Sequence, residues 1–258
     1  MIFVIDIGNT NLKCGLFKDD KLVNSFRIAT DTRRTGDEYS AIMQTLFENF
    51  GYTFKDVTGI ILSSVAPTLN YTIEHVCKTY FGIFPIVVEP GIKTGINIKY
   101  DNPKELGADR IVNAVSAVVK YGGPCIVVDF GTATTFSVVS RNSDFIGGAI
   151  CPGIKTSMDA LISSASRLSR FELEKPKKII GRNTTTNLQS GFINGFIGLV
   201  DNLVCEIKEE MGEPNALVVA TGGLSELLQG SKKKIIDIID RDLTLNGLKY
   251  IYDLNKEQ

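Results

Sequence analysis

The chain has 258 residues, a formal net charge of -1, 43% hydrophobic residues and 22% charged residues. Its length allows two modest domains, and its composition is ordinary for a soluble globular protein. Because its net charge is near zero, the protein lacks the excess positive charge typical of proteins that bind nucleic acid or an anionic membrane. The one basic run, Lys232 to Lys234, is typical of a solvated loop.

The cysteines point to a reducing environment. They are odd in number, widely spaced and without a Cys-x-x-Cys pair: Cys14, Cys77, Cys125, Cys151 and Cys205. Neither a disulfide framework nor a zinc site fits this pattern, so we expect small buried hydrophobic residues and a cytoplasmic location. We also expect no signal peptide and no apolar stretch approaching the roughly 18 residues of a membrane span.

The predicted elements of the first half begin with a meander of three strands. Ile2 to Ile5 form an apolar run, a turn follows at Asp6 to Asn11, and two further strands cover Leu12 to Phe17 and Leu22 to Ala29. The elements expected after the meander are a helix at Asp37–Phe50, a strand at Gly59–Val65, a helix at Thr68–Tyr80, a strand at Ile86–Val88 and a helix at Pro103–Tyr121.

The second half repeats this opening. Aligning Asp6 with Asp129 also aligns Gly8 with Gly131, and the offset of 129 − 6 = 123 residues is close to half the chain. The predicted elements are strands at Cys125–Val128, Thr135–Ser140 and Asp144–Ile150, a helix at Ile154–Ser164, a polar stretch at Ser166–Asn187, a helix at Leu188–Met211 and a strand at Leu217–Ala220. We place the domain boundary near the end of the helix at Pro103–Tyr121, which gives domains 1–117 and 118–258.

The strand–turn–strand unit with Asp-x-Gly at its turn suits phosphate binding. Its backbone N–H groups and hydroxyls can cradle phosphate oxygens, glycine permits close approach, and the carboxylate can hold a cation. One copy is weak evidence, but two copies, at Asp6 and Asp129, could grip a triphosphate across an interdomain cleft. The duplicated pattern resembles the actin/hexokinase-like superfamily, which implies an α/β fold of two ribonuclease H-like domains. The chain has no Gly-Lys dipeptide for a Walker A loop and no Gly-x-Gly for a Rossmann fingerprint.

Asp109 and Arg110 are a candidate base and anion-binding group. They follow Gly107 inside the predicted helix, where a glycine costs roughly 1 kcal/mol relative to alanine and so indicates close approach. A surface ion pair is the alternative. The only histidine, His75, falls in a predicted amphipathic helix, so we expect a carboxylate to be the base.

Three other glycine groups leave two interpretations open. Thr221-Gly222-Gly223 could lie against a nucleotide or simply turn the chain, and Gly147 to Gly153 could shape a pocket or cap a helix. The third group predicts tight helix packing, either across a dimer or inside the core, and comprises Gly191, Gly195 and Gly198.

Taken together, these motifs resemble those of type III pantothenate kinases. They occur in the family's order: Asp6-Ile7-Gly8-Asn9-Thr10-Asn11, Gly107-Ala108-Asp109-Arg110, Asp129-Phe130-Gly131-Thr132-Ala133-Thr134-Thr135, Gly147-Gly148-Ala149-Ile150-Cys151-Pro152-Gly153 and Thr221-Gly222-Gly223. The resemblance implies phosphorylation of pantothenate by ATP to 4′-phosphopantothenate, the first step of coenzyme A synthesis. It also implies a homodimer with pantothenate near the subunit interface.

The resemblance assigns a role to individual residues. ATP phosphates would bind the segment Asp6, Ile7, Gly8, Asn9, Thr10, Asn11, Leu12 and Lys13, with Asp6 near magnesium, and Thr132 would contact ATP. Asp109 would accept the proton, and Asp129 would hold a monovalent cation, K⁺ or NH₄⁺. Pantothenate would bind Tyr100, Gly107, Ala108, Asp109, Arg110 and Thr184.

Three other functions share parts of this pattern. An actin-like filament protein would carry the duplicated hairpins, and sedimentation with ATP would detect it. A regulatory accessory factor for transcription is the second, although the missing basic patch argues against direct DNA contact. A sugar kinase or polyphosphate phosphatase of the same superfamily is the third, and a substrate panel would separate these enzymes.

Overall fold

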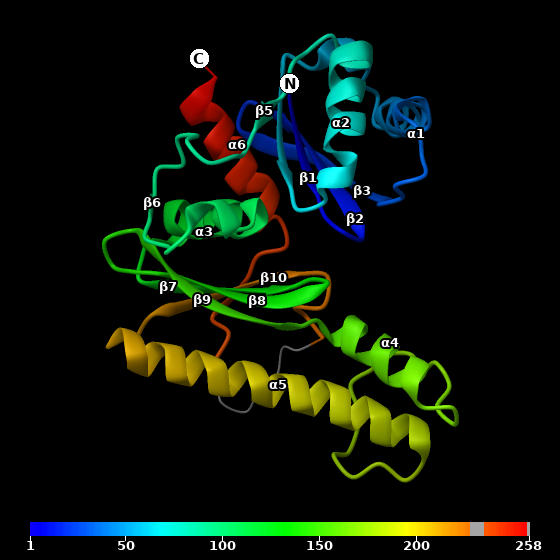
Figure 1. The fold of residues 1–258 in the computed structure, drawn as a ribbon, viewed down its shortest axis with the longest axis vertical. Helices are drawn as coiled ribbons and strands as arrows, with labels where there is room; N and C mark the ends of the chain where they lie inside the picture. The colour runs from blue at the N-terminus through cyan, green and yellow to red at the C-terminus, as the bar shows by residue number, and fades with distance from the viewer. Residues whose placement is uncertain (228–234, 257–258) are drawn as a thin grey trace. The chain divides into compact units, whose positions relative to one another are not determined.

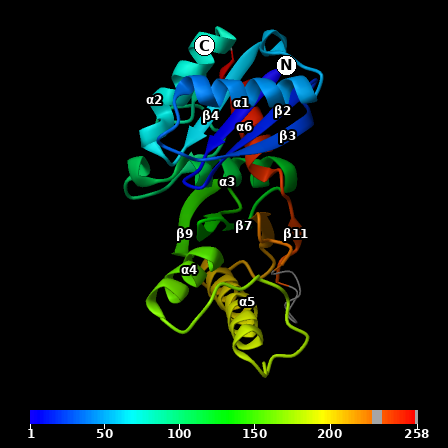
Figure 2. The same ribbon diagram turned by 90° about the vertical axis from the view of Figure 1, so that its right-hand side faces the viewer.

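The computed structural model describes residues 1–227 and 235–256, so the run Lys232 to Lys234 lies outside the described residues. The chain forms two compact units (Figures 1 and 2). The first unit comprises Met1–Lys120 together with the segment that begins at Asp242, and the second comprises Tyr121–Arg241.

A mixed five-stranded sheet organises the first unit. Its strand order is β3-β2-β1-β4-β5, with antiparallel pairing from β1 to β3 and parallel pairing of β4 with β1 and β5. The bounds are Ile2–Ile7 for β1, Asn11–Lys18 for β2, Lys21–Ala29 for β3, Gly59–Ser64 for β4 and Ile86–Val87 for β5. The expected meander is therefore present.

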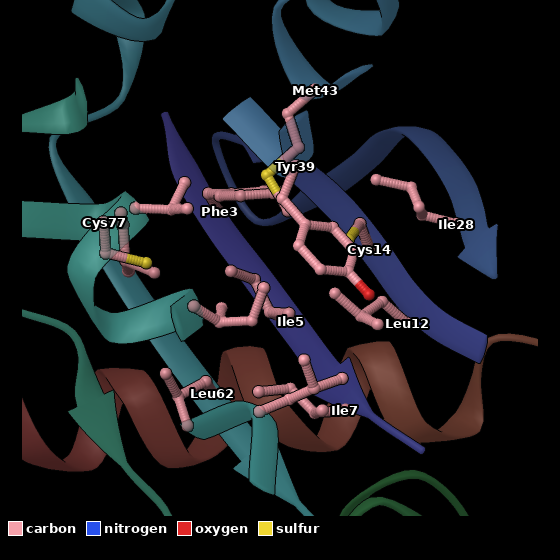
Figure 3. Packing of buried hydrophobic residues seen from close by; sticks show 14 of the residues in the cluster. Phe3, Ile5, Ile7, Leu12, Cys14, Ile28, Tyr39, Met43, Leu62 and Cys77 are labelled. Atoms are coloured by element: carbon pink, nitrogen blue, oxygen red, sulfur yellow. The ribbon is translucent and has the colours of Figure 1, made fainter. Parts of the chain in front are cut away.

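Helices cover both faces of this sheet (Figures 1 and 2). Alternate β1 residues Phe3, Ile5 and Ile7 are fully buried and pack with α1 (Gly36–Asn49) and α2 (Pro67–Val76), as Figure 3 shows. Side chains of successive strand residues point to opposite faces, so Val4 and Asp6 belong to the other face, against which α6 packs. That face also carries Gly15, where an added Cβ would lie 3.1 Å from Leu245 Cδ1.

The C-terminal helix α6 (Leu243–Asn255) belongs to the first unit, whereas the expected division gave all of 118–258 to the second domain. The reason is its apolar face, which packs on β1, β2 and β4. Its Leu243, Leu245, Leu248 and Ile251 are completely buried.

The predicted helix at Pro103–Tyr121 is two elements. A short 3₁₀ turn covers Pro103–Glu105, Leu106 is extended with ψ 121, and helix α3 spans Ala108–Tyr121. Gly107 therefore precedes the helix and is not inside it, and its carbonyl accepts the first helical hydrogen bonds from Arg110 and Ile111. Two shorter elements of this unit are the π-helical continuation of α2 at Cys77–Phe81 and strand β6 at Asn97–Ile98.

The second unit repeats the meander and adds two helices. Along its sheet the order is β11-β10-β7-β8-β9, and β7, β8 and β9 are antiparallel. The bounds are Cys125–Phe130 for β7, Ala133–Val139 for β8, Asp144–Pro152 for β9, Leu217–Gly222 for β10, Ile238–Ile239 for β11, Ile154–Ser164 for α4 and Thr184–Met211 for α5. One sheet face, with Ile126, Val128 and Val218, forms the core with α5.

Helix α5 begins at Thr184, four residues before the predicted start, because Asn183 caps it with a bond from Thr186 N–H. We expected no apolar stretch long enough for a membrane, but α5 is long and apolar enough by length and composition. Its Ile193, Val200 and Val204 are buried in the core of the second unit, so we interpret α5 as a helix that packs on the sheet of that unit.

The five cysteines are free thiols. Cys14, Cys77 and Cys125 are buried as expected, Cys151 is half-buried and Cys205 is exposed. Burial raises the pKa of the Cys77 and Cys125 thiols to about 12, so both are protonated at neutral pH.

Candidate active site

In the first unit, Asp6 lies near the carboxyl end of the central strand β1. Its neighbours across the sheet are Lys13 on β2 and Ser63 on β4. The Ser63 hydroxyl donates a hydrogen bond of 2.7 Å to Asp6 Oδ1. This bond fixes the carboxylate near the C-terminal ends of the strands, where ligands of such α/β folds bind.

The turn after Asp6 is tight and polar. Gly8 N–H donates to Asn11 O over 3.1 Å, and a Cβ on Gly8 would lie only 2.9 Å from that oxygen, so a larger residue would open the turn. Asn9, Thr10 and Asn11 are exposed at its tip. The turn thus presents backbone and polar groups to a ligand.

Asp109 occupies the first turn of α3 against a slot created by Gly107. A Cβ on Gly107 would lie 2.5 Å from Asp109 Oδ1 and 3.6 Å from Val65 Cγ1. Val65 N–H in turn donates to Ile7 O over 3.0 Å. The Gly107 position, with the Asp109 carboxylate beside it, therefore lies near the C-terminal ends of β1 and β4, the end of the sheet that carries the Asp6 turn.

The environment of Asp109 favours a proton acceptor. Burial raises the pKa of its carboxyl above the ordinary value, although Arg110 N–H donates 2.8 Å to Oδ1 and the Arg110 charge opposes the shift. A carboxylate with a raised pKa binds a proton more readily than an exposed one, as a general base requires. Arg110 itself is buried, and Tyr100 is half-buried two residues after β6.

In the second unit, Asp129 lies near the end of β7 between Thr135 on β8 and Thr221 on β10. The diglycine motif makes room for its carboxylate, because a Cβ on Gly222, whose φ is +94°, would lie 2.7 Å from Asp129 Oδ1. The hydroxyl of Thr221 is buried and has no hydrogen-bond partner in the described part of the chain. The sequence did not reveal either relation, since both depend on the pairing of β7 with β10.

The turn after Asp129 mirrors the one after Asp6. Gly131 N–H donates to Ala133 O over 3.0 Å, and the carbonyl of Thr132 accepts from Gly153 N–H over 3.0 Å. Gly153 has no room for a side chain against Gly131 and Thr132, which explains the last glycine of the 147–153 motif. Thr184 is exposed in the first turn of α5.

The structure divides the predicted site residues between the units. Asp6 to Lys13, Tyr100 and Gly107 to Arg110 belong to the first, and Asp129, Thr132 and Thr184 to the second. Among residues 1–227 and 235–256, no group of three or more His, Cys, Asp or Glu side chains could hold a metal ion. The candidate cation ligands are therefore single carboxylates, Asp6 and Asp129.

Two β-meanders with matching Asp-x-Gly turns, each on a mixed sheet, define the actin/hexokinase-like class of ATP-binding proteins. Similar solved structures agree. A Baf family protein from Campylobacter jejuni, described as a transcriptional activator, is 22% identical with a TM-score of 0.61, covering 99% of this chain and 100% of that one. Component A of (R)-2-hydroxyglutaryl-CoA dehydratase from Acidaminococcus fermentans is 13% identical with a TM-score of 0.58, covering 99% of each chain. MreB 5 of Spiroplasma citri, bound to AMPPNP, is 12% identical with a TM-score of 0.58, covering 99% of this chain and 97% of that one.

These low identities show the fold alone, and a family model carries the assignment further. The model for type III pantothenate kinase matches residues 2–206. The chain belongs to the type III pantothenate kinase family, whose members phosphorylate pantothenate with ATP in coenzyme A biosynthesis.

Proposed function

We propose that this chain transfers the γ-phosphoryl group of ATP to the terminal hydroxyl of pantothenate, giving 4′-phosphopantothenate, with Asp109 as general base. The observation that carries the base assignment is the half-buried Asp109 carboxyl in the slot left by Gly107, near the C-terminal end of the strand that bears the Asp6 turn. Asp109 accepts the proton of the hydroxyl as the oxygen attacks phosphorus.

The ATP phosphates bind the turn formed by Asp6, Ile7, Gly8, Asn9, Thr10, Asn11, Leu12 and Lys13. Its tight geometry and exposed polar tip support this role, and Lys13, which pairs with Asp6 across the hairpin, adds positive charge. Thr132, in the matching turn of the second unit, supplies a further ATP contact. Phosphoryl transfer depends mainly on positioning and neutralisation of charge, which these turns provide.

Asp6 fits a magnesium ion that is shared with phosphate oxygens, because Mg²⁺ is commonly bound by one or two carboxylates and substrate phosphates. The Ser63 hydroxyl orients this carboxylate at 2.7 Å. When bound, the ion would neutralise phosphate charge. The residues of this chain do the rest, since Asp109 accepts the proton and the turns hold the phosphates.

Asp129 fits a monovalent cation, K⁺ or NH₄⁺. The supporting observation is the buried Thr221 hydroxyl on the neighbouring strand, which has no protein partner among the described residues. A carboxylate beside a hydroxyl without a partner is an oxygen donor set suited to such an ion. The cation would add positive charge near the second phosphate turn.

Pantothenate binds Tyr100, Gly107, Ala108, Asp109, Arg110 and Thr184 in this proposal. Arg110 is the group suited to the pantothenate carboxylate, because a guanidinium binds carboxylates through two parallel hydrogen bonds. Asp109, the neighbouring residue, is the group proposed to meet the hydroxyl end of the substrate.

We further propose a homodimer formed through α5. Gly191, Gly195 and Gly198 are exposed, and a Cβ on any of them would meet nothing within 4 Å in the described structure. The interpretation that this stripe packs inside the core is therefore wrong, and a second copy is the partner we propose. The location we propose is the cytoplasm, where free thiols persist.

The test is ADP release by the purified protein with ATP, magnesium and pantothenate, in potassium and in sodium buffer. Release that requires both pantothenate and potassium supports the reaction and the cation role of Asp129. Release without pantothenate would indicate a hydrolase or a filament ATPase. No release in either buffer would contradict the proposal and favour a regulatory role, as described for the Campylobacter jejuni protein.

A further inference from the structure

The two proposed phosphate-binding turns, which follow Asp6 and Asp129, each accept hydrogen bonds from residues that come after the third strand of the meander. In the first unit Thr30 comes directly after β3 and makes two bonds to the turn. Its backbone N–H donates to Thr10 O over 3.0 Å, and its hydroxyl donates to Gly8 O over 2.7 Å. One threonine therefore holds two carbonyls of the first turn.

The second unit repeats this arrangement with different residues. Gly153, directly after β9, donates its backbone N–H to Thr132 O over 3.0 Å. Thr156, in the first turn of α4, donates its hydroxyl to the same oxygen over 2.7 Å. In both units a backbone N–H and a threonine hydroxyl from beyond the third strand hold the carbonyls of the turn.

The chemistry of phosphate binding explains why the carbonyls need to be held. A backbone N–H attracts a phosphate oxygen, whereas a carbonyl oxygen in the same place repels it. Glycine permits peptide orientations that other residues resist, and each turn contains one, Gly8 or Gly131. A donor fixed on the carbonyl keeps the peptide in one orientation.

We infer that Thr30 and Thr156 are positioning residues for ATP, whose hydroxyls hold the two phosphate turns in their binding conformation. The inference rests on the proposed function, in which both turns bind ATP. Neither threonine belongs to an Asp-x-Gly motif, and 22 and 24 residues separate them from the carbonyls they hold. Their role is visible only once the strands are paired.

Thr30→Val and Thr156→Val remove each hydroxyl and keep the side-chain shape. We expect each variant to raise the KM for ATP and the Kd for AMPPNP about three- to tenfold, the effect of one lost hydrogen bond. The KM for pantothenate stays unchanged, and Thr30→Ser and Thr156→Ser, which keep the hydroxyl, restore the wild-type values. The matched control is Thr45→Val, which removes a hydroxyl bond of 3.0 Å to Ala41 O on α1 and should change neither KM.

Unchanged ATP KM and AMPPNP Kd in both valine variants would overturn the inference. An equal rise in both substrates' KM that serine does not restore would do the same, because it indicates a general structural defect. AMPPNP binding requires no turnover, so it tests the inference even if pantothenate is not the substrate. Thr156 is exposed, so its variant carries the test if Thr30→Val does not fold.

Discussion

Asp109 Oδ1 lies 2.5 Å from the position that a Cβ on Gly107 would occupy. Asp109 and the glycine two residues before it therefore form one structural unit, and the side chain at 107 controls where the carboxylate can point. The relationship accounts for a glycine immediately before a helix, where many residues could otherwise stand.

Gly107→Ala is expected to displace the Asp109 carboxylate and lower kcat about tenfold or more, because small displacements of a reacting group are costly. Steady-state kinetics with saturating ATP and pantothenate would measure it. The control is Gly36→Ala at the start of α1, where a Cβ approaches no atom closer than 3.4 Å. Equal kcat values in the two variants would contradict the claim that Gly107 sets the position of the Asp109 carboxylate.

Asp109→Asn is expected to lower turnover about 100-fold or more, since a positioned base contributes that much, while AMPPNP still binds. The same change should raise Tm at pH 7.5. Burial raises the pKa of Asp109, so its stabilising contribution is complete only below the unfolded pKa and is lost as pH rises through the folded value. The Tm gain should therefore shrink as pH is lowered. Undiminished turnover would rule out the base assignment.

The pH dependence of turnover follows from the same group. A general base must be deprotonated, so with Asp109 in this proposed role kcat/KM should fall with decreasing pH along a limb whose midpoint lies above the ordinary aspartate value of 3.8. A pH series in a constant-ionic-strength buffer, with folding followed by circular dichroism, would measure this limb. The expectation fails if kcat/KM stays constant down to the pH at which the protein unfolds.

Much of the fold could be predicted from local pattern. Short apolar strands bounded by polar turns located both meanders, and the repeat of Asp6 at Asp129 predicted two similar units. Local signals failed at Pro103, because Asn followed by Pro can begin either an α-helix or a 3₁₀ helix. The chain makes one 3₁₀ turn there and becomes extended at Leu106. The roles that the sequence suggested for Asp6, Asp129 and the other site residues remain predictions.

Relations between distant segments could not be predicted. Gly59 leaves the space that the Tyr252 ring fills, and Gly247 allows α6 to approach the Val112 carbonyl of α3. Both contacts place the C-terminal helix in the first unit, although nothing near residue 250 signals that partner. The Thr221 hydroxyl beside Asp129 is similar, because only the register of β10 with β7 reveals it.

Thr221→Val tests the proposed cation site without relying on turnover. The buried hydroxyl has no partner in the described residues, so valine should leave Tm in sodium buffer unchanged or raise it. Wild-type protein should gain Tm when potassium replaces sodium, and the variant should lose that gain, together with a higher potassium requirement for activity. An identical potassium response in both proteins would exclude Thr221 from the site.

Gly195→Glu tests the dimer. The position is exposed and open, so the variant should fold, but a glutamate on the small-residue stripe would block close approach of a second α5 and place two like charges together. We expect the mass from light scattering to fall from that of a dimer to that of a monomer. The control is Ala41→Glu, which adds the same charge to an exposed position of α1 and should leave the dimer intact. A dimer that persists in Gly195→Glu would show that another surface joins the subunits, and a monomeric wild-type protein would remove the dimer from the proposed function.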